Sequence, residues 1–316
     1  MFPIIDISSW QFEDLYVSGS KEKRWYRNPT DNKLHLFKLP VSLTSDTWTN
    51  LNEYSGEMWS EKIASEIGNA LGLCIHEVNI ASLKVTDEVI NHYGLDPKRL
   101  VQDNIHGALC TSFLKEGQES LIEGADMIME YDFTYDRNKL RGDAEVYSFD
   151  LLFRLFNDYG FLPHLFNMII FDILIGNTDR HQDNFGIIRN EATNDVRFAP
   201  FYDNASSLGR EMTGRRVSLI IEDAPMFNAY LHGKKSSSLI KWGDITNFEK
   251  LNMFVLFKKI VSCAPQIKDY IRMLEVLSDN IIDGIINQVS EVMSENQKTF
   301  VSKVLKARRD LLLKEK

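Results

Sequence analysis

The polar run GNTDRHQDN at residues 176–184 contains the side chains best suited to chemistry. It leaves one apolar stretch of chain and enters another at residues 185–188. After a turn at residues 190–195 the chain returns and reaches Asp203. A hairpin would bring Asp203 back beside Asn184, so the sequence predicts a carboxylate and an amide oxygen side by side. Both are ligands that Mg²⁺ accepts.

Phosphoryl transfer is the chemistry that this order of residues indicates. It needs a divalent cation held by oxygen ligands, a carboxylate near the attacking hydroxyl and a cation on the phosphates. Asp179 and Asn184 have the Asp-x-x-x-x-Asn spacing of the protein-kinase catalytic loop, and Asp203 follows in the order of the metal-binding aspartate. Two alternatives stay open: these residues could serve only as turn residues, or His181 could ligate zinc with a nearby aspartate.

A nucleotide would need a phosphate-binding loop and a cation, and the N-terminal part of the chain offers both. Ser18, Gly19 and Ser20 form a small-residue loop, and Lys38 lies in an apolar run that reads as a strand. Backbone N–H groups of such a loop can approach phosphates, while a strand lysine neutralises them. An ordinary hairpin turn and a charged residue on an edge strand are the alternatives.

In protein kinases a helix glutamate positions the strand lysine. Apolar residues at helical spacing between positions 59 and 70 predict an amphipathic helix, and Glu61 lies near its start. Glu61 is therefore the candidate partner of the lysine. Glu53, Glu57 and Glu66 are alternatives, and a solvent-exposed helix glutamate remains a further one.

Residues 127–133, MIMEYDF, read as a strand between the two halves of the chain. A hinge strand here would present backbone groups to adenine, with Glu130 and Tyr131 at its centre. The same apolar residues could instead belong to the core of a sheet.

The elements that must position these residues fall into two lobes. Helices are predicted at residues 149–156 and 162–175 and in a series beyond residue 247. Strands are predicted at residues 14–18, 33–39, 73–83 and 127–133. The fold class is thus α+β, with a small mixed lobe at residues 1–130 and a mainly helical lobe at residues 131–316.

Composition narrows the classes of protein that need to be considered. The 316 residues carry a formal net charge of −9, which argues against a protein that binds nucleic-acid phosphates directly. Three widely separated cysteines fit a reducing compartment and argue against a cysteine-based zinc cluster. Without a signal peptide or a long apolar span, we expect a cytoplasmic protein that does not contact a membrane.

With these motifs together, the chain resembles the HipA-like serine/threonine kinases, whose best-known members are toxins of toxin–antitoxin systems. The resemblance covers most of the chain. It rests on SGSKEK at residues 18–23, FKLP at residues 37–40, IGNTD at residues 175–179 with the following asparagine, and APFYD at residues 199–203.

The resemblance implies a two-lobed protein-kinase-like fold that uses ATP and Mg²⁺. It implies that Asp179 is the catalytic aspartate, that Asn184 and Asp203 bind Mg²⁺ and that Lys38 contacts the nucleotide phosphates. Lys23 would belong to the phosphate-side loop, and His181 would support the catalytic loop. The loop serines, Ser18 and Ser20, are candidate autophosphorylation sites because the family's loop can be modified in this way.

The chain departs from the family pattern at two places. Asp183 stands where a lysine is frequent, and the glycine-containing loop begins within the first twenty residues. From the resemblance we therefore expect the additional N-terminal subdomain of the family's longest members to be absent. The chain therefore resembles the compact HipT-type and CtkA-type members. We expect a protein substrate with a serine or threonine acceptor and a small, separately encoded antitoxin or subdomain-like partner. A small-molecule or lipid kinase and a nucleotide-binding pseudokinase are the alternatives.

Overall fold

The computed structural model describes most of the chain. The described residues are 1–15, 22–46, 48, 53–100, 102–139, 147–244, 247–289 and 291–316. The predicted loop residues Ser18, Gly19 and Ser20 lie outside these ranges.

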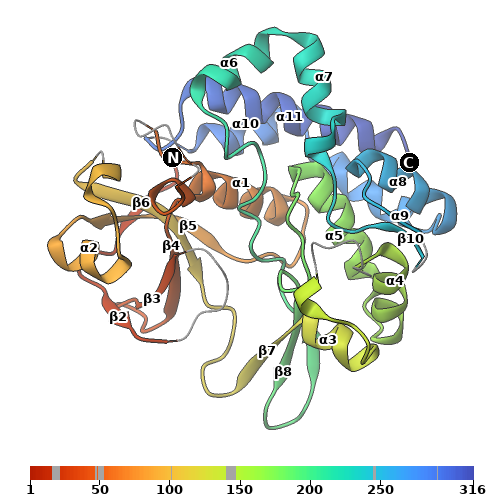
Figure 1. Ribbon diagram of the computed structural model, residues 1–316, viewed down its shortest axis with the longest axis horizontal. Helices are drawn as coiled ribbons and strands as arrows, with labels where there is room; N and C mark the ends of the chain where they lie inside the picture. Colours follow the sequence, from red (N-terminus) through yellow and green to blue (C-terminus); the bar gives the residue numbers. More distant parts are fainter. Residues whose placement is uncertain are drawn as a thin grey trace.

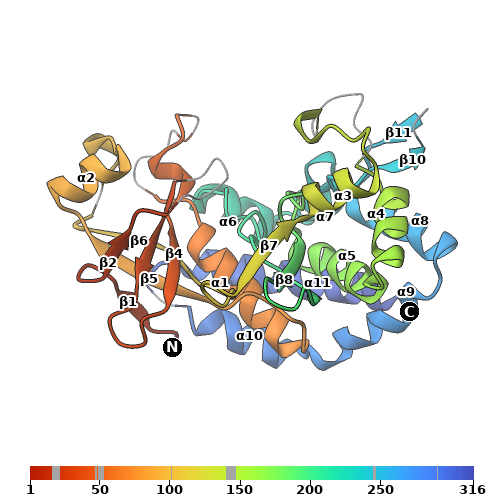
Figure 2. The ribbon, with the colours of Figure 1, turned by 90° about the horizontal axis from the view of Figure 1, so that it is seen from below.

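The first half of the chain builds a six-stranded sheet with the order β1-β5-β6-β4-β3-β2. Neighbouring strands are antiparallel except for β1 and β5, which are parallel. Figures 1 and 2 show this sheet on the left of the molecule. The strands are β1 (Ile4–Asp6), β2 (Gln11–Glu13), β3 (Lys23–Arg27), β4 (Leu34–Lys38), β5 (Val78–Lys84) and β6 (Asn104–Thr111).

Helix α1 (Glu57–Ala70) connects the six-stranded sheet to the helical half of the molecule. It packs on β5 and β6 and also contacts α10 (Asp279–Asn287), and Figure 2 shows it between these elements. Most of its side chains are buried, including polar ones, because both of its sides are covered. A glutamate on this helix can therefore face the interior.

The second half is mainly helical around a three-stranded sheet with the order β7-β8-β9. Its strands are β7 (Glu119–Glu123), β8 (Gly186–Asn190) and β9 (Val196–Phe198). The helices of the second half are α3 (Gly124–Tyr131), α4 (Phe149–Asp158), α5 (Leu162–Ile175), α6 (Gly214–Glu222), α7 (Ala224–His232), α8 (Met253–Cys263), α9 (Ile267–Ile271), α10 and α11 (Glu295–Leu313). A short helix α2 (Asp87–Tyr93) follows β5, and the strands β10 (Trp242–Asp244) and β11 (Asn247–Glu249) form a hairpin.

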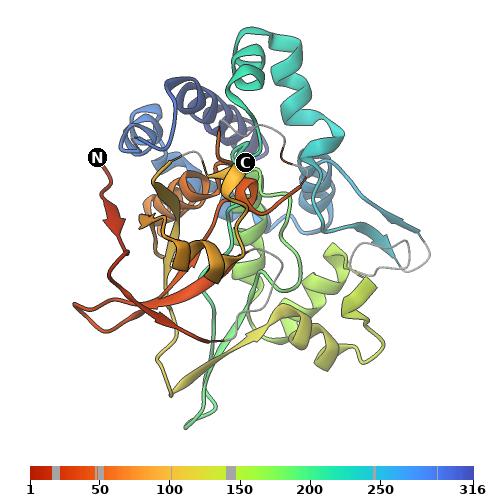
Figure 3. The ribbon, with the colours of Figure 1, turned by 60° about the vertical axis from the view of Figure 1, so that its left-hand side comes forward.

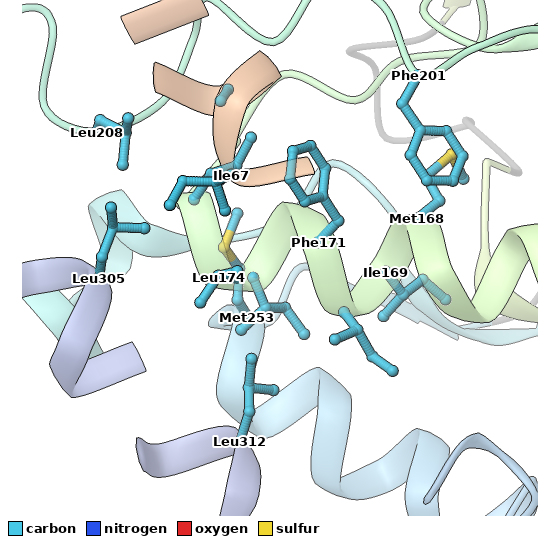
Figure 4. Close-up of a cluster of buried hydrophobic side chains, with 14 of the residues drawn as sticks. Ile67, Met168, Ile169, Phe171, Leu174, Phe201, Leu208, Met253, Leu305 and Leu312 are labelled. Carbon is cyan, nitrogen blue, oxygen red and sulfur yellow. The ribbon is translucent and has the colours of Figure 1, made fainter. Parts of the chain in front are cut away.

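Helix α5 forms the centre of the main core. Figure 4 shows its apolar side chains, among them Phe171 and Leu174, facing residues from four other parts of the chain. These are Ile67 of α1, Phe201 and Leu208 of the segment after β9, Met253 of α8, and Leu305 and Leu312 of α11. The helix is apolar on nearly every side because it is surrounded. The polar run that follows it consequently starts from a rigid point.

Gly176 ends α5 in the left-handed conformation, with φ of 70°. The backbone N–H of the next residue, Asn177, donates to the carbonyl of Asp172 at 2.8 Å. A Cβ at Gly176 would lie 2.8 Å from the guanidinium of Arg308. Glycine is thus needed both for backbone conformation and for space.

Replacing Gly176 with alanine is expected to lower the free energy of unfolding by about 1–2 kcal/mol, since an alanine in the left-handed region is strained. Chemical denaturation with urea would measure the change. Gly284 of α10 is a matched control, because a Cβ there would meet no heavy atom within 4 Å and its φ is not positive. Gly284→Ala should be neutral or stabilising, and equal effects of the two substitutions would contradict the argument.

The structure confirms the α+β class, the amphipathic helix α1, and the helices α4 and α5. The predicted strand at residues 127–133 is wrong, because residues up to Tyr131 form helix α3. The buried residues of α3, including Met127 and Ile128, would fit one face of a helix as well as a strand. In so short a run, the spacing of apolar residues cannot distinguish a helix from a strand. Of the predicted strand at residues 14–18, Asp14 and Leu15 lie outside any strand, since β2 ends at Glu13, and residues 16–18 lie outside the described ranges.

The chain passes from the first sheet to the second between β6 and β7, at residues 112–118. This crossing is earlier than the division predicted near residue 130, which stays a prediction. None of the helices in the described part of the chain has the length and apolar character needed to span a bilayer.

Candidate active site

The loop between α5 and β8 is held by hydrogen bonds among its own residues. The Asp179 backbone N–H donates to Asn177 Oδ1 at 3.0 Å, and the Asp179 carbonyl accepts from the His181 backbone N–H at 2.8 Å. The Asn184 side-chain Nδ2 donates to the same Asp179 carbonyl at 2.8 Å. These bonds fix Asp179 and Asn184 in one compact turn. The four-residue spacing therefore sets their relative position.

Arg180 joins this loop to the segment that contains Asp203. Its guanidinium pairs with the Asp172 carboxylate at 2.8 Å and donates to the carbonyl oxygens of Asn184 and Tyr202, each at 2.7 Å. Burial alone would lower the pKa of Arg180, but the Asp172 carboxylate outweighs burial and raises the pKa. Because both residues are buried, removing either partner would leave an unpaired charge in the core.

The sequence analysis did not identify Arg180 and Asp172 as part of the site. A signal was present, since Asp172 is the one acidic residue in the apolar helix α5. A carboxylate inside such a helix requires a cationic or hydrogen-bonding partner.

Lys38 lies between two carboxylates that come from different parts of the chain. Its Nζ is 2.9 Å from Glu61 Oε1 and 3.2 Å from Asp203 Oδ1. Burial alone would lower the pKa of Lys38, but the carboxylates of Asp203 and Glu61 help to raise it well above its ordinary value. The lysine is therefore a fixed positive charge that joins β4, α1 and the segment after β9.

The structure distinguishes Glu61 from the alternative glutamates of the sequence analysis. The Glu57 carboxylate pairs with Arg210, and Glu66 pairs with Lys62 at 2.6 Å. Glu53 accepts a hydrogen bond from the Gly214 backbone N–H at 3.2 Å. Glu61 has no solvent exposure and points at Lys38.

Asp203 has φ of 51°, in the left-handed region that aspartate tolerates better than most residues. Uncommon backbone conformations of this kind cluster at functional sites. Because Asn184 Nδ2 is used by the Asp179 carbonyl, Asn184 Oδ1 is the amide atom that can bind a cation. One carboxylate and one amide oxygen suit Mg²⁺, which is usually held by one or two protein ligands together with phosphates and water, and the nearby lysine suits those phosphates. Among the described residues, no group of three or more His, Cys, Asp or Glu side chains could hold a metal ion.

His181 and Asp183 stabilise the outer side of the loop between α5 and β8. His181 Nδ1 accepts from the Asp183 backbone N–H at 3.2 Å, and the Asp183 carboxylate pairs with Arg137 at 2.8 Å. Burial raises the pKa of Asp183, but His181 and Arg137 outweigh it and lower the pKa below its ordinary value. Asp183 therefore has a structural partner at the position where the family often has a lysine.

The remaining predicted residues lie in different places. Lys23 begins β3 and is the cross-strand neighbour of Lys38. Glu130 and Tyr131 lie on α3 rather than on a hinge strand, and Glu130 accepts a hydrogen bond from the Tyr159 hydroxyl at 3.2 Å. Their predicted contact with adenine rested on the strand that is absent, so we do not retain it.

Comparison with known proteins finds similarity both in sequence and in three-dimensional structure. The family profile described as the HipA-like C-terminal domain matches residues 15–243. The serine/threonine-protein kinase CtkA of Helicobacter pylori is 21% identical over 302 residues, which cover 94% of this chain and 81% of CtkA. The crystal structure of the proinflammatory kinase CtkA of Helicobacter pylori aligns with a TM-score of 0.74 at 19% identity, covering 99% of this chain and 98% of that chain.

HipA of Shewanella oneidensis MR-1, from a complex with HipB and operator DNA, aligns with a TM-score of 0.52 at 14% identity. The alignment covers 95% of this chain and 64% of that HipA chain. These structures confirm the kinase-like fold predicted from the sequence. Because the profile spans well over half of its residues, the chain belongs to the HipA-like C-terminal domain family.

Proposed function

We propose that this chain is an ATP- and Mg²⁺-dependent serine/threonine protein kinase. The observation that carries the proposal is the position of Lys38 between Glu61 and Asp203. Arg180 ties the segment of Asp203, through the Tyr202 carbonyl, to the loop of Asp179 and Asn184. A kinase-type transferase is what the family and the fold of CtkA support. The proposed acceptor, a serine or threonine hydroxyl, is supported by the resemblance to CtkA, a serine/threonine-protein kinase.

Each residue has a chemical role in this proposal. Asp179 accepts or orients the proton of the incoming hydroxyl, and Asn184 Oδ1 and Asp203 hold the divalent cation. Lys38 neutralises phosphate charge and is itself oriented by Glu61. Arg180 holds the loop that contains Asn184 and the segment that contains Asp203 in fixed positions relative to each other. When bound, Mg²⁺-ATP supplies the phosphoryl group and the positive charge that faces it.

A separately encoded antitoxin and a role as a toxin are further parts of the proposal. They are supported by HipA of Shewanella oneidensis, which was crystallised with HipB and operator DNA. A cytoplasmic setting is supported by the three cysteines, all of which are free thiols.

The test is incubation of the protein with γ-labelled ATP and Mg²⁺, alone and with cell lysate, followed by phosphoamino-acid analysis. Labelled phosphoserine or phosphothreonine that disappears with a chelator is the expected result. ATP binding without protein labelling would favour a small-molecule kinase or a pseudokinase, and absence of ATP binding would overturn the proposal.

Ser18→Ala and Ser20→Ala test autophosphorylation in the same assay, and full self-labelling of the double variant would exclude these two sites.

A further inference from the structure

A cavity of about 370 Å³ opens beside Asp179. Its walls come from the catalytic loop, the segment after Asp203, the α6–α7 pair and α11, and Figure 3 shows α6 and α7 standing above the rest of the molecule. Asp179 lines the cavity, whereas Lys38, Asn184 and Asp203 do not. The cavity therefore adjoins the proposed base from a side other than the one with the lysine and the cation ligands.

The cavity wall carries more positive than negative side chains. Among the described residues that line it, the carboxylates are those of Asp179 and Glu211. The cationic side chains are those of Arg210, Arg216, Lys235 and Arg308. Arg210 is paired with Glu57 outside the cavity lining, but no described carboxylate forms an ion pair with the other three.

Arg308 is the informative member of this group because it is 2% exposed and has no carboxylate partner among the described residues. Its guanidinium donates to the Ile173 carbonyl at 2.7 Å and to Ser236 Oγ at 2.9 Å, while its Nε is buried without a hydrogen bond. Burial lowers the pKa of Arg308. A buried cation is costly unless it is paired.

Arg180 provides the comparison within the same molecule. It is equally buried, but its charge is matched by the Asp172 carboxylate. At Arg308 the carbonyl of Ile173, near the C-terminus of α5, supplies only part of such compensation. An anion in the cavity would supply the rest.

We propose that this cavity binds an anionic group of the acceptor substrate, a carboxylate or a phosphate, close to the hydroxyl that Asp179 activates. The inference rests on the proposed kinase function and adds the class of substrate: a protein segment with an acidic or phosphorylated residue near its serine or threonine. Arg308 recognises the anion from the buried end of the cavity. Arg216 and Lys235, which are exposed, attract it at the entrance.

Binding without turnover tests this proposal independently of catalysis. Fluorescence polarisation would compare three labelled degenerate peptide pools with a central serine, flanked on both sides by glutamate, glutamine or phosphoserine. Tighter binding of the glutamate or phosphoserine pool than of the glutamine pool is expected, and the stronger of the two identifies the anion. Binding should weaken as salt increases. Equal binding of all three pools would overturn the proposal.

Arg216→Glu and Arg215→Glu form a matched pair of variants. Both positions are exposed on α6 and undergo the same change of charge, but only Arg216 lines the cavity. Arg216→Glu should weaken binding of the acidic pool by about tenfold, while Arg215→Glu should leave it nearly unchanged. Equal losses in the two variants would indicate general attraction to a basic surface and would contradict a defined site.

Arg308→Gln tests the buried end of the cavity. It should remove the preference for the acidic pool while the ATP affinity stays close to that of the wild type, which also reports that the variant is folded. An unchanged preference in folded Arg308→Gln would exclude Arg308 as the anion ligand.

If the acidic pool binds but no transfer from ATP occurs, the kinase proposal fails while the anion site stands. If transfer occurs without any preference for the acidic pool, the anion site alone fails.

Discussion

Replacing Asp179 with alanine is expected to reduce phosphoryl transfer by about 100- to 10,000-fold, the usual contribution of a positioned general base. The loop should keep its shape, because the hydrogen bonds within it use the backbone N–H and carbonyl of Asp179 and the side chains of Asn177 and Asn184. The substitution removes a bond of 3.4 Å that Asp179 Oδ2 accepts from Ser206 Oγ, outside the loop. ATP affinity should change little, since the lysine and the cation ligands remain. Initial rates of label transfer and equilibrium binding of ATP would measure the two quantities separately.

Asp195→Ala is a suitable control for this experiment. Asp195 is an exposed carboxylate in the turn between β8 and β9, and it accepts a hydrogen bond from Thr193 Oγ1 at 2.7 Å. Its removal should leave the transfer rate at the wild-type value. If Asp179→Ala also transferred phosphate at the wild-type rate, another group would have to act on the acceptor hydroxyl. If Asp179→Ala lost ATP binding as well, the aspartate would be holding the nucleotide side of the site.

Replacing Lys38 with methionine is expected to abolish transfer and to destabilise the fold by about 3–5 kcal/mol, which is the usual cost of leaving a buried charge without its partner. Glu61 has no solvent exposure, and its Oε2 already lacks a hydrogen bond in the structure. Without Lys38, the Glu61 carboxylate would face Asp203 with no cation between them. Urea denaturation would measure the stability, and label transfer would measure the activity.

A double variant separates the structural role of Lys38 from its functional one. Lys38→Met with Glu61→Leu removes both members of the buried pair, so much of the lost stability should return. Transfer should stay absent, because no cation then faces the phosphates. Recovery of transfer together with stability would show that Lys38 acts only by holding α1 against the sheet. A double variant as unstable as Lys38→Met would show that Glu61 is not the group left unpaired.

The control is the corresponding set of variants at a second ion pair on α1, Lys62→Met alone and Lys62→Met with Glu66→Leu. It shows whether the loss of stability and of transfer is specific to the pair of Lys38 and Glu61. Lys62 and Glu66 also form an ion pair on α1, at 2.6 Å, but Glu66 is partly exposed to solvent. Loss of a pair that water can reach should cost about 0.2–1 kcal/mol and should not affect transfer.

Local sequence determined several parts of the site. Asp179 and Asn184 lie in one tight loop with four residues between them, so their spacing alone fixes how they meet. The glycine that ends α5 and the turn that returns the chain toward Asp203 are also local features, since each depends on a few consecutive residues. Helices α1 and α5 could likewise be predicted, because their apolar residues are long and regular enough to specify a helix.

Tertiary structure decided the parts that depend on distant segments. The sequence offered Glu53, Glu57, Glu61 and Glu66 as partners for Lys38, and packing of α1 between the sheet and the helices left Glu61 facing the lysine. The run at residues 127–133 was too short for the spacing of its apolar residues to distinguish a helix from a strand. In the folded protein, residues 127–131 belong to helix α3. Arg308 reaches the end of α5 from a helix more than 130 residues further along the chain. No local pattern records such a contact, because its energy comes from burial and charge that exist only once the chain has folded.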